Sequence, residues 1–246
     1  MLLTWIIMFS ILGSVGAITG AALLLIFSAH MRKTLLPGLL SYATGTLLGA
    51  AFLGMIPKAM QQATVLSVSS TVLCGIVLFF LLEKMVIWRH CHNADCEIHG
   101  SAAPLVLIGD AFHNFVDGVV ITAAFLTSIP LGVAASLAVI AHEIPQEVGD
   151  FAILLDSGYS RTRAMSLNAL SSLTTLPGAI IAYYFLGSTM EAIPYILALS
   201  AASFIYIAIA DLVPNLHRQV GLKPVLIQLV LLLAGIGTMT IFQLAS

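Results

Sequence analysis

The sequence predicts an all-α integral membrane protein with eight transmembrane helices. Hydrophobic residues make up 60% of the 246 residues, charged residues only 8%, and the mean hydropathy is +1.07. A soluble domain carries about 25% charged residues. About 20 apolar residues cross the hydrocarbon core of a bilayer. Eight largely apolar runs of that length lie near 5–29, 36–57, 65–88, 103–126, 131–154, 164–188, 192–214 and 222–245.

We expect one transmembrane domain over 1–246, with a cytoplasmic loop at 89–102 inside it. The other connections are short and carry turn residues, among them Pro37-Gly38, Pro130, Gly158 and the stretch from Gly221 to Pro224. Only a few residues join the fourth and fifth spans. These two spans are therefore expected to form an antiparallel hairpin.

Basic residues predict the orientation. All but one of the 9 Lys and Arg residues fall on one side of the predicted spans: Arg32, Lys33, Lys84, Arg89, Arg161, Arg163, Arg218 and Lys223. Only Lys58 falls on the other. By the positive-inside rule this side is cytoplasmic, and both termini lie on the non-cytoplasmic side. No basic residue precedes the first apolar run, so we expect an uncleaved helix rather than a signal peptide.

A faint internal repeat relates the second span to the seventh. A shift of 157 residues places Pro57 on Pro214, Ala51 on Ala208 and Thr46 on Ser203. The two spans are an odd number of crossings apart, so helices 1–3 and 6–8 would form an inverted repeat around helices 4 and 5. Inverted repeats are common in carriers, which bind substrate at mid-membrane between them.

The predicted loop is rich in Cys and His. Its sequence RHCHNADCEIHG, residues 89–100, contains His90, Cys91, His92, Cys96 and His99. Such tracts often bind metal, although this spacing matches no structural zinc finger. We expect a capture or sensing site there; a solvated linker is the alternative. The third cysteine, Cys74, falls in a span, and no disulfide framework is implied.

Two polar stripes interrupt the fourth and fifth spans. Residues three or four apart share a helix face, so the fourth span carries a stripe of Asp110, His113, Asn114 and Asp117. The fifth carries His142, Glu143, Gln146, Glu147 and Asp150. Ionisable groups at bilayer depth cost roughly 2.5–3.5 kcal/mol each on insertion scales and usually mark an ion or substrate pathway.

In an antiparallel hairpin these stripes meet near the bilayer midplane. Imidazole nitrogen combined with carboxylate oxygen suits Zn²⁺ and neighbouring first-row ions, whereas oxygen alone would suit Mg²⁺ or Ca²⁺. A lone His or Asn in a span is usually a hydrogen-bond partner of another helix, but so many converging ligand types favour a metal site. Asp110 and Asp150 are expected to orient ligands or line the path. Asp211 in the seventh span reads as a pathway or packing residue.

The segments HNFVDG (113–118) and HEIPQEVGDFAILL (142–155) closely resemble the ZIP (Zrt-, Irt-like protein) family of metal transporters, nearest the branch whose fifth helix reads HEXPHE. The resemblance implies a pair of adjacent metal positions with bridging carboxylates. It also implies an elevator-like movement of a helix bundle and transport of Zn²⁺, often Fe²⁺ or Mn²⁺, toward the cytoplasm. The implied ligands are His113, Asn114, Asp117, His142, Glu143 and Glu147. Gln146 departs from the branch, which has His there.

The leading hypothesis is therefore a divalent-metal importer with zinc as transported substrate and no organic cofactor. Ligand types leave the order among Zn²⁺, Fe²⁺, Mn²⁺ and Cd²⁺ open. The alternatives are an intramembrane zinc enzyme, although Gln146 breaks the HExxH motif of zinc proteases, and a metal sensor without flux. The expected partners are metal ions and the lipid bilayer. The apolar surface permits a homodimer, and the lack of a basic footprint excludes nucleic acid.

Overall fold

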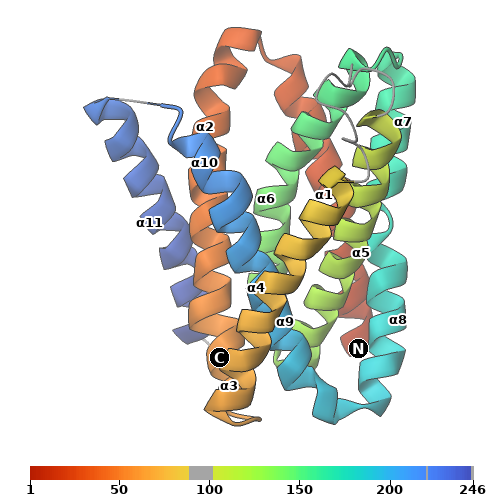
Figure 1. The fold of residues 1–246 in the computed structure, drawn as a ribbon, viewed down its shortest axis with the longest axis vertical. Helices are drawn as coiled ribbons and strands as arrows, with labels where there is room; N and C mark the ends of the chain where they lie inside the picture. The colour runs from red at the N-terminus through yellow and green to blue at the C-terminus, as the bar shows by residue number, and fades with distance from the viewer. Residues whose placement is uncertain (89–101, 220, 245–246) are drawn as a thin grey trace.

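Eight helical segments long and apolar enough to cross a membrane make up the protein (Figure 1). The computed structural model describes residues 1–88, 102–219 and 221–244, and no β-strand occurs in these ranges. The prediction of an all-helical membrane protein with eight spans is confirmed. The predicted Cys/His loop, with His90, Cys91, His92, Cys96 and His99, lies outside the described residues.

The helices are α1 (Leu2–Ile26), α2 (Ala29–Gly49), α3 (Ile56–Met60), α4 (Val65–Trp88), α5 (Ala102–Thr127), α6 (Ile129–Asp156), α7 (Arg161–Ser172), α8 (Thr175–Ser188), α9 (Ile193–Tyr206), α10 (Val213–Leu216) and α11 (Leu222–Leu244). A π-helical turn, Ala50–Met55, joins α2 to α3, and another, Ile207–Leu212, joins α9 to α10. A 3₁₀ turn, Met190–Ala192, precedes α9.

The turn expected at Pro37-Gly38 is wrong, because Pro37 lies inside α2. The chain instead turns at Phe27 and Ser28, and the Ser28 hydroxyl accepts a hydrogen bond of 3.3 Å from the backbone N–H of Met31. This N-cap satisfies an otherwise unpaired N–H and starts the helix early. A membrane helix tolerates an internal proline where its surroundings satisfy the freed backbone groups.

The sixth span is two helices rather than one. Helix α7 ends at Ser172 and α8 begins at Thr175. Pro177 explains the break, because a proline ring conflicts with the carbonyl four residues earlier, here that of Leu173. The break lies beside the polar residues of α5 and α6, and it brings the start of α8 close to α5.

The two π-helical turns support the inverted repeat. They begin at Ala50 and Ile207, at the spacing of 157 residues that relates the second span to the seventh. Each precedes a proline, Pro57 or Pro214, that disrupts the hydrogen-bond ladder. Figure 1 shows α2 running down to α3 while α9 runs up to α10, so the two segments have opposite directions.

Glycine allows pairs of helices to pack with their backbones in close contact. A Cβ atom added to Gly45 of α2 would lie 2.1 Å from the carbonyl oxygen of Leu232 in α11, and one on Gly235 would lie 2.4 Å from that of Tyr42. A Cβ on Gly118 of α5 would lie 2.1 Å from the carbonyl oxygen of Thr175 in α8. Gly118 therefore lets the backbone of α8 lie directly against that of α5.

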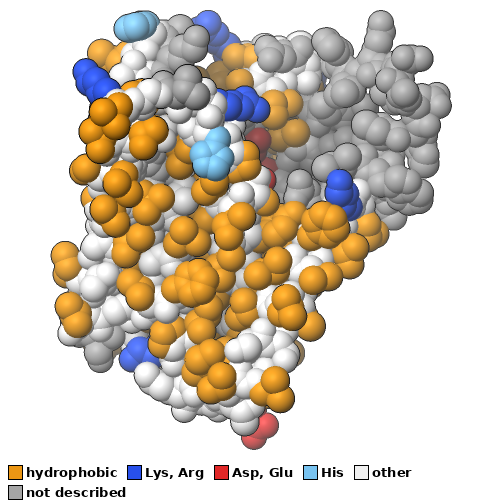
Figure 2. Space-filling model, turned by 60° about the vertical axis from the view of Figure 1, so that its left-hand side comes forward, with side chains coloured by type: hydrophobic (Ala, Val, Ile, Leu, Met, Phe, Trp, Pro, Cys, Tyr) orange, Lys and Arg blue, Asp and Glu red, His pale blue; other side chains and the backbone are white. Residues whose placement is uncertain are grey.

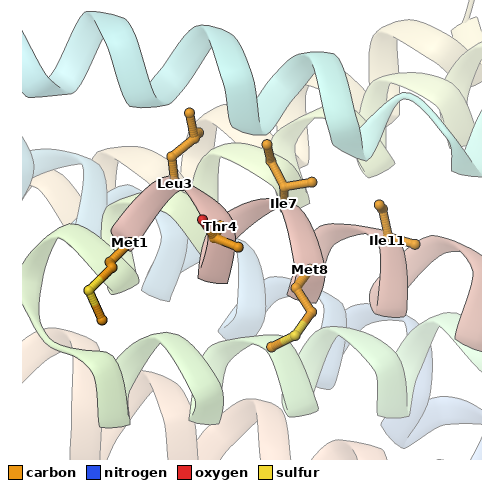
Figure 3. Close-up of a pocket in the computed structure, with 6 residues that line it drawn as sticks. All are labelled: Met1, Leu3, Thr4, Ile7, Met8 and Ile11. Carbon is orange, nitrogen blue, oxygen red and sulfur yellow. The ribbon is translucent and has the colours of Figure 1, made fainter.

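The outer surface suits a hydrocarbon environment. Hydrophobic side chains cover most of the face seen in Figure 2, and most of the Lys and Arg side chains in view lie in its upper half. A shallow groove of about 580 Å³ along α1 is lined by Met1, Leu3, Thr4, Ile7, Met8 and Ile11 (Figure 3). With no ionisable side chain in its lining, this groove is part of the apolar exterior rather than a metal site.

Both chain ends lie at one end of the bundle in Figure 1. We call the opposite end the basic end. It holds the described segments that carry Lys84, Arg161, Arg163, Arg218 and Lys223. Lys58 in α3 lies at the same end as the termini.

Candidate metal centre

Helices α5 and α6 form the expected hairpin. Ser128 alone separates them, and its hydroxyl accepts a hydrogen bond of 3.3 Å from the backbone N–H of Leu131 to cap α6. Because the hairpin is tight, the polar stripes of the two helices face each other near the middle of the bundle. Asp110, Asn114, Asp117, His142, Glu143 and Glu147 are all at most 4% exposed.

The first cluster holds two imidazoles and two carboxylates. Single ligand atoms of His113, Asp117, His142 and Glu143 all lie within 4.8 Å of one another. The Nε2 atoms of His113 and His142 are 3.1 Å apart. The Asp117 Oδ2 atom lies 3.4 Å from His142 Nε2, and Glu143 Oε1 lies 3.3 Å from His113 Nε2. Four such donors around one point match the preference of Zn²⁺ for nitrogen and oxygen.

The orientation of His142 fits a metal ligand. Its Nδ1 lies 2.9 Å from the carbonyl oxygen of Ala138, one turn earlier on α6. A carbonyl can only accept, so Nδ1 is the donor in this bond, and in the neutral ring Nε2 then presents its lone pair to the cluster. Metal-binding histidines are commonly fixed in this way by a hydrogen bond from the other ring nitrogen.

A second cluster adjoins the first. Carboxylate oxygens of Asp110, Glu143 and Glu147 come within 4.8 Å of one another. Glu143 belongs to both clusters, so its carboxylate lies between them. The second cluster contains no nitrogen donor among the described His and Cys residues.

Most of these carboxylate oxygens lack a hydrogen-bond donor. Within the described part of the chain, both oxygens of Asp117, Glu143 and Glu147, and Oδ2 of Asp110, are buried without one. A buried ionised carboxylate without compensation is very costly. The chemistry of the donor set therefore indicates that cations or protons compensate these groups.

Asn114 is engaged on both sides of its amide. Its Nδ2 donates to Oδ1 of Asp110 at 3.0 Å, and its Oδ1 accepts a hydrogen bond of 3.1 Å from the Thr175 hydroxyl. In this arrangement the amide links α5 to α8 and steadies Asp110.

Sequence reasoning missed the contribution of the sixth span. Besides Thr175, the amide of Asn168 in α7 donates a hydrogen bond of 3.0 Å to the carbonyl oxygen of Glu147. Ser171 and Ser172 follow Asn168 by three and four residues, Thr175 follows them by four and three, and all four residues are at most 5% exposed. This polar stripe in an apolar span was the available signal.

The remaining predicted residues line a cavity of about 750 Å³ next to the clusters. Asp110, His113, Gln146, Asp150 and Asp211 are among its lining residues. Gln146 donates a hydrogen bond of 3.2 Å to Oδ1 of Asp110. Asp150 and Asp211 lie outside both clusters, and both line the cavity. Figure 2 shows acidic side chains within a recess toward the basic end.

Comparison with known proteins identifies the family. Residues 88–243 match the family described as ZIP Zinc transporter. Zinc transporter ZIP13 of Pongo abelii is 33% identical over 267 residues, covering 98% of this chain and 79% of the relative. The chain belongs to the ZIP zinc transporter family.

Two further relatives share a shorter region. Zinc transporter foi of Drosophila melanogaster is 37% identical over 60% of this chain, and Zinc transporter ZIP4 of Mus musculus is 40% identical over 58%. These alignments cover 21% of each relative's own length.

The ZIP family assignment identifies this chain as a multi-pass membrane transporter for divalent metal. It rules against the intramembrane enzyme that the HExx sequence had left open.

Proposed function

We propose that this ZIP family chain carries divalent transition-metal ions, zinc foremost, into the cytoplasm through the α5–α6 centre. The observation that carries the proposal is the convergence of His113, Asp117, His142 and Glu143, whose ligand atoms lie within 4.8 Å of one another. Two imidazole nitrogens and two carboxylate oxygens can replace the water that a zinc ion loses on leaving solution.

The cavity supports a path from this centre to the basic end. Its lining runs from His113 and Asp110 to Asp150, then to Asp211 and Asn215 near the end of α10. Carboxylates along such a path attract cations and lower the cost of dehydration. Basic segments mark the cytoplasmic side of a membrane protein. A cavity that runs from the centre toward the basic end therefore supports an inward-open state of the transporter.

The other half of the bundle is closed by apolar packing. Ile121 and Phe125 on α5, Leu131 and Val139 on α6, and Met55 next to α3 are at most 2% exposed and belong to one core cluster. Since a hydrated ion cannot cross such a dry layer, metal from the outside needs a second conformation. A movement of the helices that carry the ligands would provide it.

Flux of radiolabelled Zn²⁺ into vesicles that contain the purified chain tests the proposal. We expect saturable uptake that His142→Ala and Glu147→Ala abolish. Glu191→Gln should retain it, because Glu191 is exposed in the turn before α9, outside both clusters. Metal binding without flux would instead support a sensor, and peptide hydrolysis without flux would support an enzyme.

A further inference from the structure

Phe204 on α9 touches the candidate metal centre from outside the α5–α6 hairpin. Its ring centroid lies 6.0 Å from that of His142, and the two ring planes meet at 66° in an edge-to-face arrangement. We infer that Phe204 is a positioning residue, which holds the His142 imidazole in the orientation that binds metal. The inference rests on the proposed function, because it concerns how the same centre holds its ion.

The contact between the two rings is favourable. Aromatic pairs prefer offset or edge-to-face arrangements with centroids about 4.5–7 Å apart. Phe204 is 0% and His142 1% exposed, so water does not compete for either ring. A rigid ring packed against the imidazole restrains the tilt of its plane, and that tilt decides where the Nε2 lone pair points.

His142 needs such a second restraint. The hydrogen bond of 2.9 Å between its Nδ1 and the carbonyl oxygen of Ala138 ties one ring nitrogen to its own helix. One hydrogen bond tolerates a range of ring tilts. The other ring neighbour, His113 at 5.4 Å between centroids, has a side chain that is 19% exposed and lines the cavity. Phe204 is fully buried and is therefore the firmer support of the two.

Small residues around Phe204 leave room for this contact. Ser200 and Ala201 lie four and three residues before Phe204, on the same face of α9, and are at most 4% exposed. On α6, Ala138 lies one turn before His142 and is fully buried. A large ring among small side chains projects from its helix, so Phe204 fills the space beside the imidazole.

Phe204 also lies at the boundary between the cavity and the dry core. Its neighbours Ser203 and Ile207 line the 750 Å³ cavity, whereas Phe204 belongs to the apolar core cluster. Among the described residues, the cavity lining includes His113 but not His142. The two histidines thus have different surroundings, and His142 is the anchored ligand of the pair.

Cobalt spectroscopy on the purified full-length chain in micelles tests the inference. Co²⁺ binds nitrogen and oxygen donors, and its visible absorption bands change with the arrangement of those donors. We expect Phe204→Leu to shift these bands and to lower Co²⁺ affinity about tenfold, as the loss of support behind a metal ligand commonly does. Phe204→Tyr keeps the ring and should retain the wild-type spectrum.

Phe125→Leu is the matched control. It removes another buried ring of the same core cluster, one that packs on Phe9, and should leave the Co²⁺ spectrum unchanged. A folded Phe204→Leu chain with the wild-type spectrum and affinity overturns the inference. Equal spectral changes in Phe204→Leu and Phe125→Leu also overturn it, because they indicate general core packing.

A measurement on the wild-type chain decides the case if Phe204→Leu does not fold. Nuclear Overhauser effects between the ring protons of His142 and Phe204 are expected in the zinc-loaded chain, and their absence overturns the inference. Zinc flux separates the two proposals. A wild-type chain that binds Co²⁺ without zinc flux removes the transport proposal alone, whereas flux together with an unchanged Phe204→Leu spectrum removes the positioning role alone.

Discussion

The hydroxyl of Thr175 donates a hydrogen bond of 3.1 Å to the amide oxygen of Asn114. The donor lies at the start of α8 and the acceptor in the middle of α5, 61 positions apart. Through the Asn114 amide this bond reaches Asp110, since Asn114 Nδ2 donates to the Asp110 carboxylate at 3.0 Å. A residue outside the hairpin thereby positions a group inside the candidate metal centre.

Thr175→Val should lower metal affinity by about 10–100-fold, the usual effect of losing a hydrogen-bonding partner behind a metal ligand. Valine keeps the shape of threonine but leaves the buried amide oxygen of Asn114 without its donor. Calorimetric titration of the purified protein with Zn²⁺ measures the change. Thr175→Ser keeps the hydroxyl and should bind as the wild type does; equal losses in both variants would point to packing instead.

Gln146→His should shift the metal preference toward zinc. The substitution places an imidazole beside Asp110 and converts an oxygen-only cluster into a mixed one, which suits Zn²⁺ better than Mn²⁺. Competition between Zn²⁺ and Mn²⁺ in vesicle uptake measures the ratio of the two fluxes. Gln146→Leu, which has no donor atom in its side chain, serves as the control and should not favour zinc.

Zinc should raise the thermal stability of the purified protein. A ligand that binds only the folded state adds about 2.7 kcal/mol when present at 100 times its dissociation constant. Here it also compensates buried carboxylates that have no hydrogen-bond donor among the described residues. A thermal-shift series with Zn²⁺ should show the rise in wild type and its loss in His142→Ala. A rise that survives in this variant would place the main zinc site elsewhere.

Gly235→Ala should destabilise the fold, whereas Gly237→Ala on the same helix should not. A Cβ on Gly235 would lie 2.4 Å from the carbonyl oxygen of Tyr42, while one on Gly237 meets nothing within 4 Å. Overpacking of this kind costs about 1–3 kcal/mol or more. Alanine in an open helical position is favoured over glycine by up to about 1 kcal/mol. Melting temperatures of the two variants in micelles give the comparison.

Periodicity predicted the hairpin and its facing stripes because a helix places residues three and four apart on one face, whatever its surroundings. The number of spans was predicted from the length of the apolar runs, which depends on local composition and not on tertiary contacts. It could not predict that Asn114 would bond to Thr175, because the pairing of α5 with α8 is a tertiary contact. The break after Ser172 went unpredicted although Pro177 signals it, since the apolar run continues through both helices.

The close glycine contacts bear on how an ion crosses the bundle. Gly118 and Gly178 join α5 to α8 backbone against backbone, while Gly45 and Gly235 join α2 to α11 in the same way. Within each pair the backbones lie too close together for one helix to slide along the other. A displacement of α5 would therefore take α8 with it. Every described donor of both clusters belongs to α5 or α6. The cargo would then travel with its coordination sphere intact, stripped of hydration once on entry and rehydrated once on release.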